Sequence, residues 1–352
     1  MAYTTINKST DYFNTVTYTG SAGGQTISGV GHQPDFIWVK QRTDAGYDHS
    51  LHNSVSGLLK QLISNSNSAE ITNTDTVTSN NADGFVLGAD SAGPSANSNN
   101  QDGKNYVAWN WKAGTTGSGT TGQNKTYNYS VNTTAGFSIM TYEGSGVTNH
   151  KIPHHLGAKP TVKFVKSTGH SENWTCYWDA FQDSSKYIQL NTTTAKQNDS
   201  GKWGGYDTSS LMNLGSDDDT NKAGSGVNFV AYCFAEKQGY SKFGSYTGNG
   251  NADGTFVYTG FKPAWIMTKV TNTTSNWFLH DNKRLGFNAS NSTLNADSNS
   301  AESSTNRLDI LSNGFKFRNT SGAVNSASNT YIYMAFAEAP LVGTNNVPAT
   351  AR

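Results

Sequence analysis

The sequence has few cysteines, few prolines and little charge. Its 352 residues include 2 Cys and 7 Pro, and only 14% are Asp, Glu, Lys or Arg. Cys176 and Cys233 cannot build the disulfide framework of a small secreted domain, and no Cys-x-x-Cys pair indicates a zinc site. We expect two isolated thiols in β cores, with a single bridge as the alternative.

No charge of one sign dominates, and no long apolar run is present. Lys plus Arg and Asp plus Glu both number 25, so the formal net charge is +0. Because wrapping nucleic acid needs clustered Lys and Arg, this balance predicts no nucleic-acid partner and no polybasic membrane-surface binding. No run approaches the ~20 apolar residues of a membrane span, so we expect no membrane insertion. Residues 1–8 lack the apolar core of a signal peptide, which predicts synthesis in a cytoplasm and release by lysis.

Glycine and aromatic residues, by contrast, are plentiful. The chain has 36 Gly, and aromatic residues make up 12% of it. That aromatic content is too high for an intrinsically disordered chain. The many Ser, Thr and Asn residues are typical of extended β surfaces and turns. We therefore predict a folded, all-β protein, in which residues 55–64 are the only plausible short helix and could equally be a strand.

One pattern occurs three times and is the strongest signal in the sequence. A strand-like run ending in Tyr-x-Gly is followed by a proline, an apolar strand ending in lysine, and a closing aromatic strand. The anchors are Pro34, Pro160 and Pro263, and Lys40, Lys166 and Lys269. Both sets are spaced by 126 and then 103 residues. Matching offsets at independent anchors predict that the prolines stand at the entry to equivalent strands.

The repeat predicts three tandem antiparallel β-sandwich or jelly-roll modules. The expected organisation is an N-terminal arm at 1–11, modules at 12–113, 131–236 and 237–339, a Gly/Thr linker at 114–130 and a C-terminal arm at 340–352. The closing strands are apolar on both faces, as central strands should be. The repeated strands predict a core containing Trp38, Trp109, Phe164, Phe229, Trp265 and Tyr331.

Histidines and acidic clusters give little indication of a metal site. His154 and His155 are adjacent, so on a strand they would point to opposite faces and could not chelate together. We expect them and His150 to lie on a turn surface. Residues 217–219 are three aspartates without the spacing of a calcium loop, and a solvated acidic loop is the favoured interpretation.

Catalytic motifs are equally scarce. Glu236 and Glu338 occupy matching positions two residues beyond a closing strand, where a structural role is favoured over catalysis. A carboxylate pair for glycoside hydrolysis stays open, because distance in space and not sequence spacing defines it. We predict that the protein is not an enzyme, with no catalytic residues, no cofactor and no metal.

Several aromatic residues lie amid Gly, Asn and Ser rather than in apolar runs. Aromatic faces flanked by such loops suit sugar binding, in which rings stack on C–H faces and amides bond hydroxyls. The alternative is that each ring simply fills a small core. The candidate glycan contacts are Trp174, Trp178, Trp203, Tyr206 and Trp277.

The repeated run also carries a family resemblance. The first copy reads YTG…GxxPDFxWVK…DGFxLG…NYVAWNWKAG, and residues 240–254 and 337–352 continue the pattern. This run resembles a family of tandem-repeat structural proteins of bacteriophages, particularly phages of marine and aquatic bacteria. The resemblance covers essentially the whole chain, implies a virion structural protein, and brings no catalytic residues with it.

We therefore expect a multi-copy surface appendage of the virion, of the tail-fibre or receptor-binding type. The expected partners are other copies of the chain in a homotrimer, phage tail or capsid proteins, and polysaccharide on the host surface. A capsid decoration or knob protein is one alternative, and a free carbohydrate-binding lectin is another. Because the arms at 1–11 and 340–352 have few large apolar groups, we expect them to lie along neighbouring subunits.

Overall fold

The prediction of an all-β protein is confirmed. A computed structural model describes residues 3–90, 98–284, 288 and 292–342. Nearly all of its regular structure is antiparallel strand. Within these ranges, no helix has the length and apolarity needed to cross a membrane.

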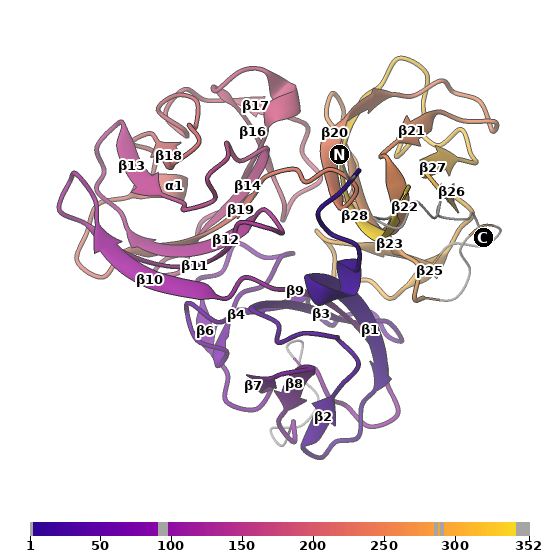
Figure 1. The fold of residues 1–352 in the computed structure, drawn as a ribbon, viewed down its shortest axis with the longest axis horizontal. Coiled ribbons are helices and arrows are strands. Elements are labelled where there is room, and N and C mark those ends of the chain that lie inside the picture. Colours follow the sequence, from indigo (N-terminus) through magenta and orange to yellow (C-terminus); the bar gives the residue numbers. More distant parts are fainter. Residues whose placement is uncertain (1–2, 91–97, 285–287, 289–291, 343–352) are drawn as a thin grey trace.

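Figure 1 shows three lobes arranged around a common centre. We call them the first lobe (residues 12–113), the second lobe (114–236) and the third lobe (237–342). A turn of 3-10 helix, η1 (Ser9–Asp11), precedes the first lobe. In each lobe a larger sheet faces a smaller one, as in a β-sandwich.

Nine strands lie in the part of the first lobe that the structure describes. They are β1 (Phe13–Thr19), β2 (Gln25–Ile27), β3 (Phe36–Gln41), β4 (Ser50–Asn53), β5 (Lys60–Gln61), β6 (Ile71–Thr72), β7 (Val77–Asn81), β8 (Gly84–Leu87) and β9 (Asn105–Trp111). The larger sheet has the order β1-β9-β3-β4 and the smaller one the order β2-β8-β7, with β5-β6 as a separate pair. Because β5 lies within residues 55–64, the short helix considered for that run is not formed.

The second lobe has ten strands. They are β10 (Thr115–Thr120), β11 (Thr126–Asn132), β12 (Phe137–Glu143), β13 (His150–Pro153), β14 (Val162–Ser167), β15 (Thr175–Trp178), β16 (Lys186–Gln189), β17 (Gln197–Asn198), β18 (Leu211–Leu214) and β19 (Asn228–Phe234). Two single turns, η2 (Asp179–Phe181) and α1 (Asp218–Asn221), complete it. The larger sheet runs β10-β11-β12-β19-β14-β15-β16-β17, and the smaller pair is β13-β18.

The third lobe has nine strands among its described residues. They are β20 (Ser241–Thr247), β21 (Phe256–Tyr258), β22 (Phe261–Val270), β23 (Phe278–Asp281), β24 (Ser292–Asn295), β25 (Ser303–Ser304), β26 (Leu308–Leu311), β27 (Gly314–Phe317) and β28 (Thr330–Pro340). The larger sheet has the order β20-β28-β22-β23-β24-β25, and the smaller one β21-β27-β26.

The larger sheets share one strand order. The order β1-β9-β3-β4 recurs as β12-β19-β14-β15 and as β20-β28-β22-β23, with the closing strand inside each sheet. Pro34 and Pro160 lie just before β3 and β14, as expected. Pro263 instead lies within β22, at a register shift against β28. The third of these strands therefore starts earlier, and the proline occupies an irregular position in its pairing.

The predicted Gly/Thr linker at 114–130 is wrong, because these residues form an edge hairpin of the second lobe, β10 with most of β11. Gly117 and Gly119 lie under the rings of Tyr129 and Tyr127, whose hydroxyl oxygens would be 2.5 and 2.6 Å from an added Cβ. Aromatic rings that cover cross-strand glycines stabilise such an edge. Glycine here makes room for a ring and does not provide a flexible connection.

The N-terminal arm packs against its own chain. Ile6 is 2% exposed and belongs to the largest hydrophobic cluster, and Thr4 is 3% exposed. Burial of Ile6 within the chain holds residues 3–11, so the premise that this arm has no apolar anchor of its own is wrong for them. Contact of the arm with a neighbouring subunit stays a prediction. In the C-terminal arm, Pro340 ends β28, and residues 343–352 lie outside the described residues.

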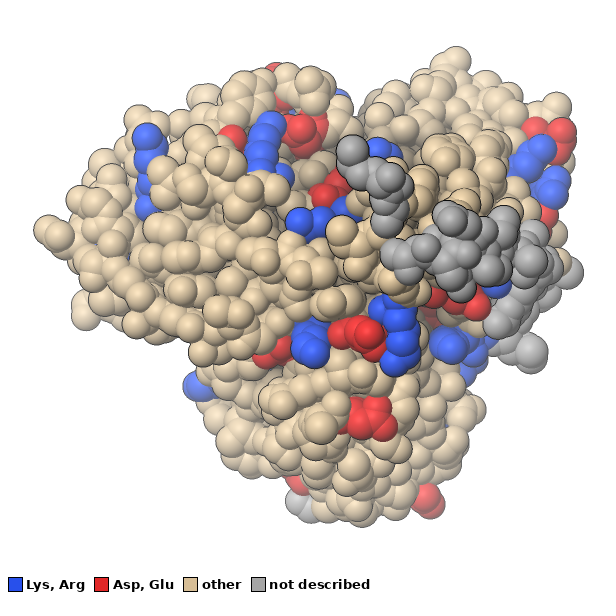
Figure 2. Space-filling view, in the orientation of Figure 1, with Lys and Arg blue, Asp and Glu red and all other residues tan. Residues whose placement is uncertain are grey.

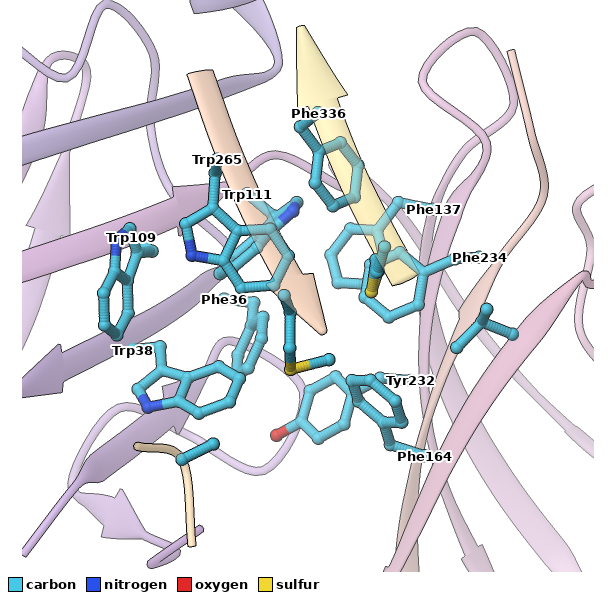
Figure 3. Packing of buried hydrophobic residues seen from close by; sticks show 14 of the residues in the cluster. Phe36, Trp38, Trp109, Trp111, Phe137, Phe164, Tyr232, Phe234, Trp265 and Phe336 are labelled. Carbon is cyan, nitrogen blue, oxygen red and sulfur yellow. The ribbon is translucent and has the colours of Figure 1, made fainter. Parts of the chain in front are cut away.

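One aromatic cluster joins all three lobes (Figure 3). Trp111 and Trp265 join the first and third lobes with ring centroids 5.6 Å apart, and Phe36 and Tyr232 join the first and second at 4.4 Å. Phe336 of the third lobe also packs against an aromatic ring of the second lobe. The opposite face of each larger sheet packs on its own smaller sheet. Each larger sheet is therefore buried on both faces.

The predicted core residues are confirmed. All have an exposed fraction of 3% or less, namely Trp38, Trp109, Phe164, Phe229, Trp265 and Tyr331. Cys176 and Cys233 are both buried and form no disulfide in the described part of the chain, as expected for isolated thiols.

The three lobes contact one another in pairs through a repeated set of loop contacts, and the three contacts together form a closed ring. Trp174 of the second lobe donates its indole N–H to the carbonyl of Ile63 in the first lobe at 2.8 Å. Trp277 of the third lobe donates likewise to Gln189 of the second at 2.9 Å. At the matching position of the first lobe, His49 Nε2 lies 2.9 Å from the carbonyl of Asn295 in the third lobe.

We call these three contacts between lobes the seams. A set of backbone hydrogen bonds also repeats at each seam. It consists of Glu70 N–H to Thr168 O at 3.1 Å, Lys196 N–H to Thr271 O at 2.8 Å and Glu302 N–H to Arg42 O at 3.0 Å. In all three cases the donor belongs to the loop and the acceptor follows the repeated lysine by two residues. The same local geometry therefore makes every seam.

The repeated lysines themselves are buried near these seams. Lys40, Lys166 and Lys269 are all 0% exposed. Lys269 Nζ donates across its seam to Thr193 O at 2.9 Å, whereas Lys166 Nζ donates to Ser167 O at 2.7 Å. Desolvation by burial lowers the pKa of each of the three from 10.5 to about 8.

We expect Lys166→Met to remove a pH dependence of stability. Because the pKa of Lys166 is lowered to about 8 by folding, the unfolded state binds more protons above that pH, and stability rises as the pH increases toward 10.5. Between pH 7 and pH 9.5 the wild type should gain about 2 kcal/mol relative to the variant. Urea unfolding of both proteins at the two pH values measures this gain. If the stability difference between wild type and variant were the same at both pH values, Lys166 would not be a charged, desolvated group at pH 7.

Candidate functional site

Four of the predicted glycan contacts are not on the surface. Trp174, Trp178, Trp203 and Trp277 are all 0% exposed, so their ring faces are closed to a ligand and that prediction is wrong. Their polar sequence neighbours do not mark exposed loops. Instead, every indole N–H is satisfied by a backbone carbonyl, and Trp178, for example, donates to Tyr333 O at 3.2 Å. Trp178 and Trp277 also pack on each other, with ring centroids 5.5 Å apart.

Tyr206 alone of the five is exposed. Half of its surface, 50%, is open to solvent, and its hydroxyl donates to Gln182 O at 3.0 Å. Lys159 Nζ lies 5.4 Å from the ring centroid, within cation–π range. Tyr206 therefore remains a candidate contact, separate from the four buried rings.

Two other exposed rings lie on the third lobe. Phe256 and Tyr258 are 43% and 53% exposed, whereas Val257 between them is 5% exposed. This alternation follows from the two-residue period of a strand, since β21 turns Val257 inward and both rings outward. Sequence reasoning missed these residues. The signal available for them was an aromatic–apolar–aromatic alternation between Gly254 and Gly260.

A cavity of about 430 Å³ adjoins Tyr258, and we call it the Tyr258 cavity. The N-terminal segment, the β19–β20 connection, the start of β20 and the end of β21 form its walls, where the chain start lies beside the third lobe (Figure 1). Its lining residues are Tyr3, Glu236, Gln238, Gly239, Ser241, Lys242, Tyr258, Thr259 and Gly260.

Two glycines allow the N-terminal segment to form one wall of the cavity. Gly260 has φ +79°, and an added Cβ would lie 2.6 Å from the Tyr3 hydroxyl. Gly239 has φ +77°, and an added Cβ would lie 2.8 Å from Thr4 Cβ. Both positions combine a left-handed backbone with close approach of another segment, which only glycine accommodates readily.

Tyr3 is held as a neutral hydroxyl at the cavity wall. Its O–H donates to Gly260 O at 2.7 Å. Desolvation by burial, together with a hydrogen bond to the Tyr258 side chain, raises the pKa of Tyr3 to about 12. Tyr3 and Tyr258 therefore present adjoining side chains at the cavity.

Glu236 is a structural residue of this wall. One carboxylate oxygen accepts the Phe243 N–H at 2.7 Å, and the other accepts from Lys242 Nζ at 3.1 Å. Its counterpart Glu338 contacts Lys262 Nζ at 3.1 Å and accepts from Asn282 at 2.6 Å. Glu236 follows the end of β19 as expected, whereas Glu338 lies within β28, which continues to Pro340. The contacts of both residues agree with a structural role.

The arrangement offers stacking and hydrogen bonding together. Exposed Tyr258 and Phe256 supply apolar ring faces, while Gln238, Ser241 and Thr259 supply uncharged polar groups at the cavity. Figure 2 shows that charged side chains are sparse on this view of the molecule, and several gather where lobes meet. Rings beside a few polar groups in a concave site recognise ligands with apolar C–H faces and hydroxyls.

A family described as Domain of unknown function (DUF7483) matches residues 8–340. The chain belongs to this family. The match runs from the residue before η1 to the last residue of β28, so it includes all three lobes. No curated protein and no solved structure matches.

Two larger cavities of this DUF7483 chain flank the β10–β11 hairpin. They measure about 610 and 640 Å³ and share Lys112, Gly114 and Tyr129 in their linings. The Tyr129 ring is stacked on His155 with centroids 3.8 Å apart, so one of its faces is already covered. These cavities therefore offer polar edges and fewer open ring faces than the Tyr258 cavity.

The histidines of the DUF7483 chain differ from expectation. His150 and His154 are both 0% exposed, so a turn-surface role is wrong for them. The ring nitrogens of His150 are satisfied inside the fold, where they lie 2.8 Å from Asn221 Oδ1 and 3.1 Å from Thr121 Oγ1. Desolvation by burial lowers the pKa of both histidines.

The aspartates at 217–219 are not a freely solvated loop. Lys202 Nζ contacts Asp217 at 2.6 Å and Asp219 at 2.5 Å, and Asp219 is only 8% exposed. The Asp217 side chain also accepts the Asp219 N–H as the N-cap of α1. In the described part of the chain, no cluster of three or more His, Cys, Asp or Glu residues could hold a metal ion.

Proposed function

We propose that this protein is a structural component of a bacteriophage particle, carried in many copies as a surface appendage of the tail-fibre or receptor-binding type. Its role is attachment and not catalysis. It is made in the host cytoplasm and released within virions by lysis. The observation that carries the proposal is the closed ring of three like lobes on a shared aromatic core, which makes a rigid body. The resemblance of the repeats to phage structural proteins supports it.

The three lobes are, in this proposal, copies of one β-sandwich module. The recurring order of the larger sheets supports this, as do the matching hydrogen bonds at the seams. In each module the larger sheet is apolar on both faces, and the smaller sheet covers only one of them. The other face must be covered by something outside the module. A ring of three such modules supplies that cover within a single chain.

A capsid decoration or knob protein is the second candidate. Three like lobes around one centre (Figure 1) fit a particle site of threefold symmetry, which favours that location. In either location the partners are tail or capsid proteins and other copies of the chain, with a homotrimer as the proposed assembly. The Tyr258 cavity taken alone also suits a free lectin.

Within the proposal, the Tyr258 cavity contacts host polysaccharide. We expect the purified full-length chain to bind at least one polysaccharide class on a glycan array, and Tyr258→Ala to weaken this binding about tenfold, since one stacked ring contributes about 1.4 kcal/mol. The exposed Val147→Ser serves as a control that retains binding. Equal binding by wild type and Tyr258→Ala would contradict this site, and loss in Tyr206→Ala alone would place the contact at Tyr206.

A further inference from the structure

A buried lysine and aspartate meet inside the second lobe, away from the Tyr258 cavity. Lys163 lies on β14 of the larger sheet, and Asp207 lies in the loop before β18 of the smaller pair. Lys163 Nζ is 2.8 Å from Asp207 Oδ1, and each side chain is only 2% exposed. The contact therefore bridges the two sheets of this lobe out of reach of solvent.

Aromatic rings enclose the pair. Lys163 Nζ lies 4.2 Å from the ring centroid of Trp203 and 5.4 Å from that of Tyr177. Trp203 is 0% exposed and packs in the hydrophobic cluster that also contains Met212. Apolar walls on several sides exclude the water that would otherwise solvate both charges or hydrolyse a bond between them.

The hydrogen bonds around the carboxyl group are unequal. Asp207 Oδ1 accepts both from Lys163 Nζ and from the Asn213 N–H, each at 2.8 Å. Asp207 Oδ2 is buried without a hydrogen-bond partner among the residues that the structure describes. Lys163 Nζ also lies 3.4 Å from Asn213 O, which helps to fix its direction.

As a simple ion pair this arrangement is unfavourable. Burying two opposite charges costs several kcal/mol for each ion, and good geometry offsets this only when the remaining lone pairs are satisfied. A buried carboxylate oxygen without a partner violates that condition. The Lys202 contacts differ, since Asp217 and Asp219 side chains are 23% and 12% exposed and share one ammonium.

We propose that Lys163 and Asp207 are joined by an intramolecular isopeptide bond. One proton first passes from the ammonium group to the carboxylate across their contact, which leaves an uncharged amine and an uncharged acid. The transferred proton lies on Oδ1, the oxygen that contacts Nζ. Nζ then attacks Asp207 Cγ, and a second proton passes from Nζ to Oδ1. The Cγ–Oδ1 bond breaks, Oδ1 leaves as water with two protons that came from Nζ, and Oδ2 becomes the amide oxygen. The products are one amide and one water molecule, and no other reactant is needed.

The bond removes both charges from the interior of the lobe. It also links β14 to the loop before β18, which closes the chain between residues 163 and 207. A covalent link across such a loop restricts the unfolded chain much as a disulfide does. Unlike a disulfide, the amide is insensitive to reduction.

The mass of the full-length wild-type chain under denaturing conditions tests the proposal. We expect a mass below that of the sequence by one water molecule, together with a branched peptide that joins Lys163 to Asp207 after digestion. The full sequence mass would overturn the proposal. Loss of one water without the branched peptide would overturn it as well, because dehydration at an Asp-Gly step such as Asp83-Gly84 gives the same mass change.

Variants make the assignment specific. Lys163→Met and Asp207→Ala should each show the full mass of their own sequence. The Lys202→Met variant should keep the loss of one water and the branched peptide, because its contacts are elsewhere in the lobe. The wild-type measurement decides the proposal even where a variant fails to fold. A branched peptide that persists in Asp207→Ala would overturn it.

Discussion

Replacing Trp265 with alanine is expected to lower the free energy of unfolding by about 3–5 kcal/mol. Trp265 is 1% exposed and lies where the first and third lobes meet. Its ring packs at 5.6 Å from Trp111 and 5.9 Å from Phe336, measured between centroids. Because these neighbours belong to different sheets, they cannot close the cavity by a small shift of one strand, and most of the cavity cost remains.

Urea unfolding followed by tryptophan fluorescence and far-ultraviolet circular dichroism measures this effect. Val147→Ala is the matched control, since Val147 is 54% exposed and should change stability by less than about 0.5 kcal/mol. We also expect the two signals to change together in the wild type, because the shared cluster couples the lobes. A similar small effect of both substitutions would contradict the central position assigned to Trp265.

Arg284→Met is expected to lower stability by about 3–5 kcal/mol, because it leaves a buried charge unpaired. Arg284 and Asp281 side chains are both 0% exposed, and Arg284 Nε lies 2.7 Å from Asp281 Oδ2. Asp281 Oδ2 also accepts from Trp109 Nε1 of the first lobe at 2.9 Å. The other end of Arg284 contacts Glu302 at 3.0 Å, and Glu302 in turn contacts Arg42 at 2.8 Å.

Chemical denaturation again provides the measurement. The control is Lys242→Met, which removes a half-exposed partner of Glu236 and should cost less than about 1 kcal/mol. Both variants replace a basic residue with methionine, and the two residues differ in how deeply they are buried. Equal losses in the two variants would contradict the view that desolvation of Asp281 makes this network important for the seam between the first and third lobes.

The strands and the core could be predicted because their signals are local. Aromatic and β-branched residues on repeated runs, such as those around Trp38 and Trp109, mark strands buried on both faces wherever the chain places them. The interpretation of residues 114–130 failed because Gly and Thr composition suggests a linker, whereas the stabilising Tyr rings come from the partner strand.

The candidate site could not be predicted, because it depends on contacts between distant segments. Trp174 has polar neighbours in sequence, yet a loop of the first lobe covers it and accepts its N–H. Tyr3 forms a wall of the Tyr258 cavity across 257 residues of sequence. Lys163 and Asp207 are 44 residues apart, and nothing in either local sequence distinguishes them from surface charges.

The location of the protein on the particle tests the account most directly. Particles of the phage that encodes the chain can be imaged by electron cryomicroscopy with Fab fragments raised against the purified protein. The account predicts Fab density at repeated positions on the outer surface, along tail fibres in the leading proposal or at capsid symmetry sites in the alternative. Purified particles that bind no Fab and contain no peptides of this chain by mass spectrometry would contradict it.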